Sequence, residues 1–301
     1  MSRRCSPATS RPYGLERVCR LGGFARSSYY SGKARDGEAE GRSENPREER
    51  RGPVPPLSND TLLDLIRQDL AASPFQGEGH RKVWARLRLG QGLIVGKNRI
   101  LRVMRENQLL SPHRQGRPPT EHDGRITTDR PGDIWATDGT RVLTVDHGLV
   151  WVFAAVEHWN AECVGIHVCK RGDRFAALEP IKSALHSLYG RVAPGVARGL
   201  SLRTDHGCQY TSDDFTTQIR SWGISHSPGF VAEPQTNGVA ERFFRTLKEQ
   251  AIYGRTFRNL EEVREAVATF VKHYNHSWLI EKNGYLSPFG ARQAWSERQA
   301  A

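Results

Sequence analysis

The hydrophobic pattern of the chain changes near residue 132, and this change constrains the fold more than any other feature. Beyond it, short β-branched and apolar segments come first, and segments with helical spacing then alternate with further apolar segments. The expected strands are residues 134–137, 142–145, 149–156, 163–168, 200–204 and 224–227, and the expected helices are 175–189, 213–222, 238–253 and 260–275. This order predicts an α/β fold with a mixed sheet flanked by helices over residues 132–295.

Two helical segments precede this region. In residues 1–32, short helices on either side of Gly22-Gly23 are typical of a helix-turn-helix or of an isolated helical pair. In residues 58–111, Ser58 can cap the first of three helices, which predicts a small all-α DNA-binding domain. Residues 33–57 hold almost no apolar side chains and predict a disordered linker, and the Pro- and Arg-rich residues 112–131 predict a second linker.

The charge of the chain is strongly positive. A net charge of +11 with a pI near 9.7 suits a polyanion such as nucleic acid, although a basic protein can also lack such a partner. Residues 76–120 carry a local net charge of +8, so we expect double-stranded DNA to lie along the helical domain. The candidate DNA contacts there are Arg81, Lys82, Arg86, Lys97, Arg99 and Arg102. The alternative is a helical bundle whose charged faces are only solvated.

The cysteines and the apolar runs indicate a cellular compartment. Five scattered cysteines without a C-x-x-C pair favour free thiols in a reducing compartment. No signal-peptide pattern follows the N-terminal arginines, and no apolar run approaches the roughly 18 residues that span a bilayer. We therefore expect a cytoplasmic protein with no membrane partner.

Three carboxylates occupy matching places in the expected α/β layout. Asp138 ends the first expected strand, Asp205 directly follows the strand 200–204, and Glu241 lies on the helix 238–253. Strand ends are where α/β sheets present functional groups. Taken singly, each carboxylate is equally compatible with a turn or a solvated position, so the interpretation rests on the combination.

The helix that carries Glu241 has one buried face. At 100° per residue, one arc of it is apolar, and its members are Ala240, Phe243, Phe244, Leu247 and Ala251. Glu241 lies at the edge of this arc, from which it can lean towards the sheet. Arg245 and Lys248 extend the same surface and are candidates to hold a phosphate backbone.

Three carboxylates suit one chemistry in particular. Mg²⁺ takes oxygen ligands and uses few protein groups. Two such ions about 4 Å apart can activate a hydroxyl nucleophile and stabilise the leaving oxygen in phosphoryl transfer. One aspartate that bridges both ions, with one further carboxylate on each, is the minimal set of ligands.

These residues resemble a known family, the OrfB-type transposases of bacterial insertion sequences within the retroviral-integrase (DDE) superfamily. The resemblance is carried by Ile134-Trp135-Ala136-Thr137-Asp138, by residues 203–212 (RTDHGCQYTS) and by residues 237–249 (NGVAERFFRTLKE). Asp205 and Glu241 are separated by 35 residues, the spacing that names this group. The segments 273–275 and 286–288 are similar to its C-terminal signature, and the helical domain is similar to its helix-turn-helix segment.

The resemblance implies an RNase H-like core with Asp138, Asp205 and Glu241 as catalytic and metal-binding residues. It implies two Mg²⁺ or Mn²⁺ ions, cleavage at the element ends and transfer of 3′-hydroxyls into DNA. It also implies an upstream OrfA-type partner and a homo-oligomer on DNA. Cys208 and Gly238 depart from the usual residues without removing a carboxylate. The alternatives are a nuclease of the same fold and a non-catalytic DNA-binding regulator.

Neighbours of the carboxylates are candidates for supporting roles. His206 follows Asp205 and can assist a metal-bound water or contact phosphate, or can be a plain loop residue. Gln209 and Tyr210 can contact DNA, but we expect buried support of the turn instead. Asn237 begins the helix motif that holds Glu241.

Overall fold

The computed structural model describes residues 5–7, 9–31, 57–111, 127–228 and 238–300, and the chain divides into two compact units, 1–57 and 58–301. Most of the two expected linkers lies outside the described residues. In the first unit, helix α1 (Leu15–Leu21) and a second helical stretch at 26–31 flank Gly22-Gly23, so the expected helical pair is present. Gly23 has a φ of +68°, which favours glycine at this turn.

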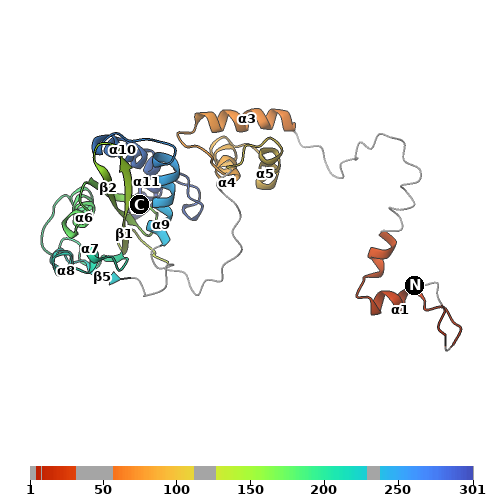
Figure 1. Cartoon of the computed structure of the whole chain (residues 1–301). Coiled ribbons are helices and arrows are strands. Elements are labelled where there is room, and N and C mark those ends of the chain that lie inside the picture. Colours follow the sequence, from red (N-terminus) through yellow and green to blue (C-terminus); the bar gives the residue numbers. More distant parts are fainter. Residues whose placement is uncertain (1–4, 8, 32–56, 112–126, 229–237, 301) are drawn as a thin grey trace. The chain divides into compact units, whose positions relative to one another are not determined.

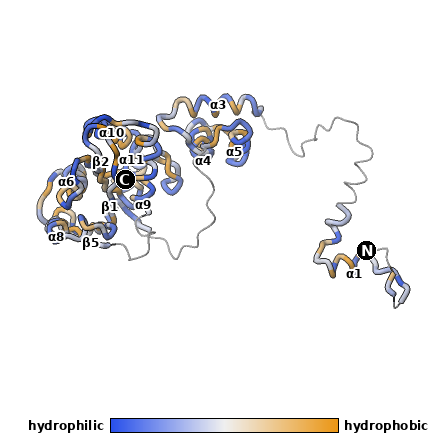
Figure 2. Tube along the Cα trace, viewed as in Figure 1, coloured by the Kyte–Doolittle hydropathy of each residue, from blue (hydrophilic) through white to orange (hydrophobic). Residues whose placement is uncertain are grey.

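The second unit begins with three helices. They are α3 (Asn59–Ala72), α4 (His80–Ala85) with its continuation η1 (Arg86–Gly90), and α5 (Lys97–Glu106). The Ser58 hydroxyl accepts a 3.1 Å hydrogen bond from the Thr61 amide, which confirms the expected N-cap. Hydrophobic and hydrophilic residues alternate along α3 (Figure 2), and the apolar residues buried between the helices include Leu62, Val83 and Ile100.

A five-stranded sheet follows, in the order β3-β2-β1-β4-β5. Its strands are β1 (Ile134–Thr144), β2 (Gly148–Glu157), β3 (Cys163–Cys169), β4 (Ser201–Thr204) and β5 (Ser225–Pro228). β2 is antiparallel to both β1 and β3, whereas β4 is parallel to β1 and to β5. This mixed sheet with helices on its faces is the RNase H-like arrangement, which confirms the expected fold class.

Helices cover both faces of the sheet (Figure 1). They are α6 (Arg174–Tyr189), α7 (Cys208–Thr211), α8 (Asp213–Ser221), α9 (Gly238–Leu247) with its continuation η3 (Lys248–Ile252), α10 (Leu260–Ser277), η4 (Glu281–Asn283) and α11 (Pro288–Ala300). β2 alternates between the two hydrophobic clusters: Val152 packs with α9 and α10, and Phe153 packs with α6 and α8. This period of two explains why its sequence is almost unbroken in apolar residues.

The structure differs from the expected elements at a few places. Residues 134–144 form one strand instead of two, so Asp138 lies inside β1 and not at its end. The reason is a continuous antiparallel ladder with β2, from Trp135 opposite Glu157 to Thr144 opposite Gly148. α7 and α11 were not expected, because the first is very short and the second has no clear apolar stripe. Within the described part of the chain, no helix is long and apolar enough to cross a membrane.

Candidate active site

Asp138 lies on the central strand β1, opposite Ala154 of β2. The strand stays regular there because Gly139 has no side chain: a Cβ at that position would lie 2.6 Å from the Phe153 ring. The Gly139 amide donates a 2.7 Å hydrogen bond to Asp138 Oδ1, and Asp138 is half-buried. The carboxylate is therefore held at a fixed point of the sheet and still reaches solvent.

Asp205 directly follows β4, the parallel neighbour of β1. The register pairs Ala136 of β1 with Arg203 of β4. Asp138 and Asp205 each follow two residues later, so the two aspartates lie at the same level of the sheet. Asp205 is exposed, and its Oδ1 accepts a 2.9 Å hydrogen bond from the Gly207 amide. This turn leads into α7 and holds the carboxylate just beyond the C-terminal end of β4.

Glu241 is carried by α9, whose apolar face packs against β1 and β2. The expected buried stripe is confirmed, since all five of its members are at most 4% exposed: Ala240, Phe243, Phe244, Leu247 and Ala251. Glu241 follows Ala240 and is itself exposed. The packing of α9 thus holds Glu241 next to β1, the strand that carries Asp138.

The electrostatics of Asp138 connect the three carboxylates. Burial raises the pKa of Asp138 from 3.8 to about 6, and the hydrogen bond from Gly139 opposes this rise. The charges of Asp205 and Glu241 raise the pKa further, and the charge of Lys248 lowers it. Asp138 therefore lies within electrostatic reach of both other carboxylates and of one cation, although the four groups come from three separate segments.

The donor set suits hard divalent cations. It consists of carboxylate oxygens, and two of its three members are exposed to solvent, where an ion can reach them. A cation there would offset the like-charge repulsion on Asp138. Among the described residues, no three His, Cys, Asp or Glu side chains lie close enough together to hold an ion, so the three carboxylates do not form a ready-made coordination set.

The other expected site residues take different positions around the carboxylates. Lys248 is half-buried at the start of η3, and Arg245 is exposed one turn earlier on α9. His206 is exposed in the turn after Asp205, and Gln209 is half-buried in α7. Asn237 lies outside the described residues.

Two of the expected DNA-contacting cations have buried partners within the protein. Arg86 pairs with Asp69 and Glu78, at N–O distances of 2.8 and 2.7 Å. Burial alone would lower the pKa of Arg86, but hydrogen bonds and charges from these two carboxylates raise it. Lys82 lies 3.2 Å from Glu78, over the ring of Trp278. The sequence pattern could not indicate that these two cations pair within the protein, because it does not show that Asp69 and Glu78 are buried.

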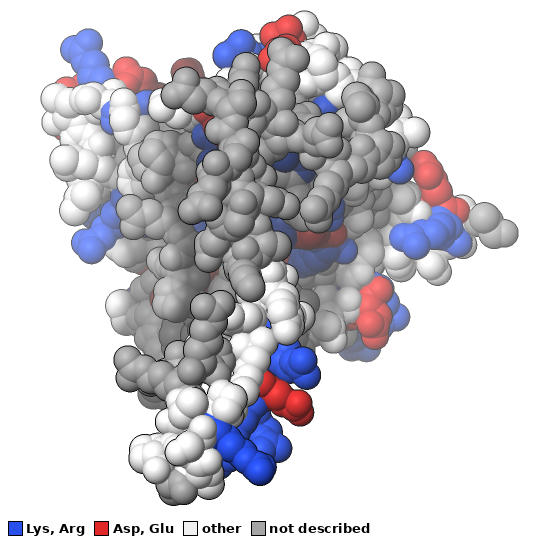
Figure 3. Space-filling model, turned by 90° about the vertical axis from the view of Figure 1, so that its right-hand side faces the viewer, with Lys and Arg blue, Asp and Glu red and all other residues white. Residues whose placement is uncertain are grey.

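The remaining expected contacts are more accessible. Arg81 and Lys97 lie near the exposed Glu281, at 2.6 and 3.7 Å, and the Lys97 ammonium also donates to Tyr285. Arg99 donates to Asn59, and Arg102 forms an exposed pair with Glu106 on the same helix. On the face shown in Figure 3, Lys and Arg side chains lie in separate groups, several of them beside Asp or Glu.

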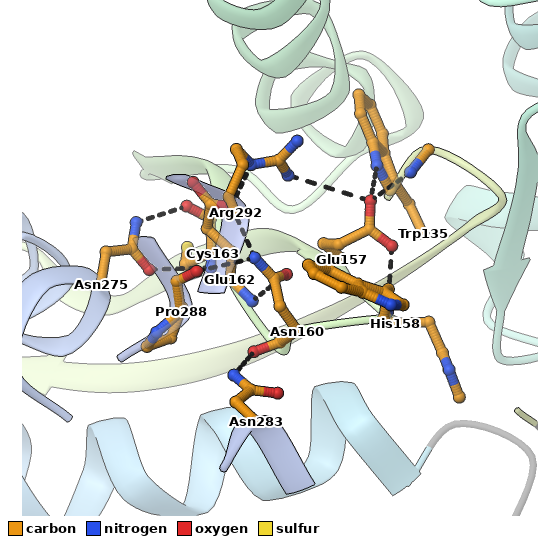
Figure 4. Close-up of polar contacts among 12 residues, drawn as sticks. Trp135, Glu157, His158, Asn160, Glu162, Cys163, Asn275, Asn283, Pro288 and Arg292 are labelled. Carbon is orange, nitrogen blue, oxygen red and sulfur yellow. Dashed lines mark hydrogen bonds and ion pairs between the residues drawn. The ribbon is translucent and has the colours of Figure 1, made fainter. Parts of the chain in front are cut away.

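A buried polar network, which the sequence did not reveal, joins the sheet to the C-terminal helices (Figure 4). The fully buried Glu157 accepts hydrogen bonds from the Gly132 amide at 2.8 Å and from Trp135 Nε1 at 3.1 Å. Burial raises the pKa of Glu157, and these hydrogen bonds and the charge of Arg292 oppose the rise. Arg292 of α11 also donates to Glu162.

Two asparagines complete this network and give the C-terminal signature a physical meaning. The Asn275 amide exchanges hydrogen bonds of 3.0 and 2.9 Å with the backbone of Cys163 on β3. Asn160 donates a 2.8 Å hydrogen bond to the carbonyl of Pro288. The segments 273–275 and 286–288 therefore anchor α10 and α11 to the sheet, because a buried amide requires both of its partners.

With this geometry in place, sequence comparisons identify the family. Two models described as "Integrase core domain" match residues 128–234 and 222–288, and together they span more than half of the chain. The chain belongs to the integrase-core family. A model described as "HTH-like domain" matches residues 58–117, which include α3, α4 and α5.

Several relatives of this integrase-core chain are transposases. The transposase for insertion sequence element IS629 from Shigella sonnei is 26% identical over 228 residues, 72% of this chain and 74% of that one. Transposase InsD of insertion element IS2 from Escherichia coli is 25% identical over 217 residues, 70% of this chain and 71% of that one. Among solved structures, the HTLV-2 integrase catalytic core domain in complex with magnesium has 17% identity and a TM-score of 0.39, covering 52% of this chain and 93% of that one.

Proposed function

We propose that this transposase of the integrase superfamily cleaves DNA at the ends of its element and transfers the resulting 3′-hydroxyls into target DNA. The reaction would use divalent metal, Mg²⁺ or Mn²⁺, held by Asp138, Asp205 and Glu241. The observation that carries the proposal is the placement of the three carboxylates: Asp138 and Asp205 lie at the same level of the neighbouring parallel strands β1 and β4, and Glu241 lies on α9, which packs against β1 and β2. Their family spacing and the integrase-core match support the same assignment.

Each carboxylate has a distinct part in this proposal. Asp138, half-buried on the central strand and influenced by the charges of both other carboxylates, would be a ligand shared by the metal ions. Asp205 and Glu241 are exposed and each complete the shell of one ion. When bound, the ions supply activation of the attacking hydroxyl and stabilisation of the leaving oxygen.

Cations near the carboxylates give the DNA its position. Lys248 is close enough to lower the pKa of Asp138, and Arg245 extends the same surface of α9. Both side chains can neutralise the phosphates on either side of the cleaved bond. This placement keeps the scissile phosphate against the three carboxylates.

The HTH-like domain supplies further contacts to double-stranded DNA. Exposed ion pairs contribute only about 0–1 kcal/mol, so phosphates can replace the exposed partners of Arg81 and Arg102. Arg86 is held by two buried carboxylates, so we assign it to the fold of the domain. The proposed assembly also includes an upstream OrfA-type partner and a homo-oligomer on DNA, which the resemblance to OrfB-type transposases implies.

The test uses the gene on a plasmid with its own flanking DNA and any upstream reading frame. Newly joined element ends are detected by PCR for the wild type and for Glu241→Gln, with DNA binding measured on both purified proteins. We expect joined ends from the wild type alone and equal DNA binding by both. Cleaved but unjoined ends would favour a nuclease of the same fold, and DNA binding without any metal-dependent product would favour a regulator.

A further inference from the structure

Tyr210 is a buried residue close to the two aspartates of the site. It belongs to the short helix α7, which follows the turn that carries Asp205, and its amide donates a 2.9 Å hydrogen bond to the Gly207 carbonyl. Its side chain is 0% exposed, and its ring packs edge-on against Phe215 at 5.3 Å between centroids. The tyrosine is buried as expected, but burial alone does not explain why it carries a hydroxyl.

The hydroxyl of Tyr210 points to the strand that carries the other aspartate. It lies beside the side chain of Thr137, the residue before Asp138 on β1, and the Thr137 hydroxyl itself donates to the Ala154 carbonyl at 2.9 Å. Burial raises the pKa of Tyr210 well above its usual value, and the charges of Asp138 and Asp205 add to this rise. The hydroxyl is therefore within electrostatic reach of both aspartates.

This hydroxyl has no well-formed hydrogen bond with any described residue. A buried hydroxyl without a partner destabilises a protein, and a phenylalanine would fill the same space without this cost. A second buried tyrosine shows the usual solution: the Tyr274 hydroxyl of α10 donates a 3.0 Å hydrogen bond to the Ala161 carbonyl. The Tyr210 hydroxyl thus lies near the candidate metal site, beside Thr137, without a hydrogen bond of good geometry.

We propose that Tyr210 is a positioning residue that links the Asp205 turn to β1 and sets the spacing of Asp138 and Asp205 for metal binding. This inference rests on the proposed metal-dependent function. In a metal-loaded site, the hydroxyl would donate to the Asp138 carboxylate or to the Thr137 hydroxyl beside it. Because Tyr210 is fully buried, it would act only through the carboxylates.

The test measures Mn²⁺ binding to the purified full chain by isothermal titration calorimetry, without DNA. Loss of a group that orients metal ligands typically costs about 10- to 100-fold in metal affinity, so we expect the Mn²⁺ dissociation constant of Tyr210→Phe to rise about 10-fold or more. The matched control is Tyr274→Phe, which also removes one buried hydroxyl. It should lower thermal stability and leave Mn²⁺ affinity within about 2-fold of the wild type.

A second variant keeps the inference testable if Tyr210→Phe folds poorly. Thr137→Val removes the neighbouring hydroxyl, and we expect this variant alone to weaken Mn²⁺ binding. Where Tyr210→Phe folds, the double variant should bind Mn²⁺ no more weakly than Tyr210→Phe does. Wild-type affinity in Tyr210→Phe, or an equal loss in Tyr274→Phe, would overturn the positioning role alone. If Asp205→Asn binds Mn²⁺ as well as the wild type does, the proposed metal site fails, and the role of Tyr210 fails with it.

Discussion

Arg86 of η1 donates two hydrogen bonds, each 2.8 Å long, to the two carboxylate oxygens of Asp69 on α3. A third nitrogen of the same guanidinium lies 2.7 Å from the buried Glu78. One arginine therefore holds two helices and a loop of the HTH-like domain together. This bidentate geometry distinguishes it from the exposed cations of the same domain.

The stability of the HTH-like domain should depend on Arg86 and not on Arg102. Arg86→Ala leaves the buried Asp69 without its cation and Glu78 with Lys82 alone, so we expect a loss of about 3–5 kcal/mol in the free energy of unfolding. Arg102→Ala removes only an exposed pair and should change stability by about 0.5 kcal/mol or less while it weakens DNA binding. Urea denaturation and a DNA-binding titration check both variants. If the two variants had the same free energy of unfolding, the structural role assigned to Arg86 would be wrong.

The pH dependence of stability should show the cost of burying the charged form of Asp138. Its pKa is about 6 in the folded protein against an ordinary 3.8, so the folded state holds more protons between these values. The stabilising contribution is therefore complete below pH 3.8 and is lost as pH rises through 6. In EDTA, Asp138→Asn should melt higher than the wild type, by a few degrees at pH 8 and by less at pH 5.

The control for this experiment is Glu265→Gln, an exposed carboxylate on α10. Its effect on the melting temperature should be small and similar at both pH values. Added Mg²⁺ should stabilise the wild type at pH 8 more than it stabilises Asp138→Asn, because the cation offsets the repulsion that the variant lacks. A gain for Asp138→Asn that does not depend on pH would contradict the predicted cost of burying a charged Asp138 beside two other carboxylates.

The anchoring of α11 should depend on one of its arginines. Arg292 pairs with the buried Glu162 and Glu157, whereas Arg298 on the same helix donates only to the Ala294 carbonyl at its surface. We expect Arg292→Ala to lower the free energy of unfolding by about 3 kcal/mol or more. Arg298→Ala should change it by about 0.5 kcal/mol or less. Chemical denaturation of both variants decides this, and equal effects would show that the network in Figure 4 does not hold the helix.

The contact of Lys248 with DNA should appear in the salt dependence of binding. Removal of one phosphate contact lowers the slope of log affinity against log salt by about 1. We expect this change for Lys248→Ala with DNA that carries an element end, and no change for Lys182→Ala, an exposed lysine on α6 that pairs with Glu179. An unchanged slope for Lys248→Ala would place the DNA elsewhere.

The layout of the core could be predicted from the sequence because its pattern is strong. The apolar run of β2, the stripe of α9 and the cap at Ser58 all follow from local spacing, and the structure confirms each of them. The continuity of β1 through Asp138-Gly139 could not be predicted, because both residue types are disfavoured in strands. Pairing with β2 and the packing of Phe153 over Gly139 override that local preference.

The cations of the helical domain show a second limit of sequence reasoning. The sequence gives their charge but not which carboxylates are buried, so Arg86 and Arg102 look alike until the partners of each are known. The same limit hides the network around Glu157, whose members lie far apart in the chain. The three carboxylates were easier to find because their spacing belongs to a known family, and the electrostatic reach of Asp138 agrees with it.

The most direct test of the carboxylate site is the rate of strand joining by purified protein, with a DNA end that already carries a free 3′-hydroxyl. The rates of the wild type, Asp205→Asn, Glu241→Gln and the double variant are compared in Mg²⁺. Because the carboxylates act as one unit, each single variant should lose about three orders of magnitude or more, and the double variant should lose no more than that. Joining by either single variant at near wild-type rate would contradict the assignment of Asp138, Asp205 and Glu241 as the catalytic site.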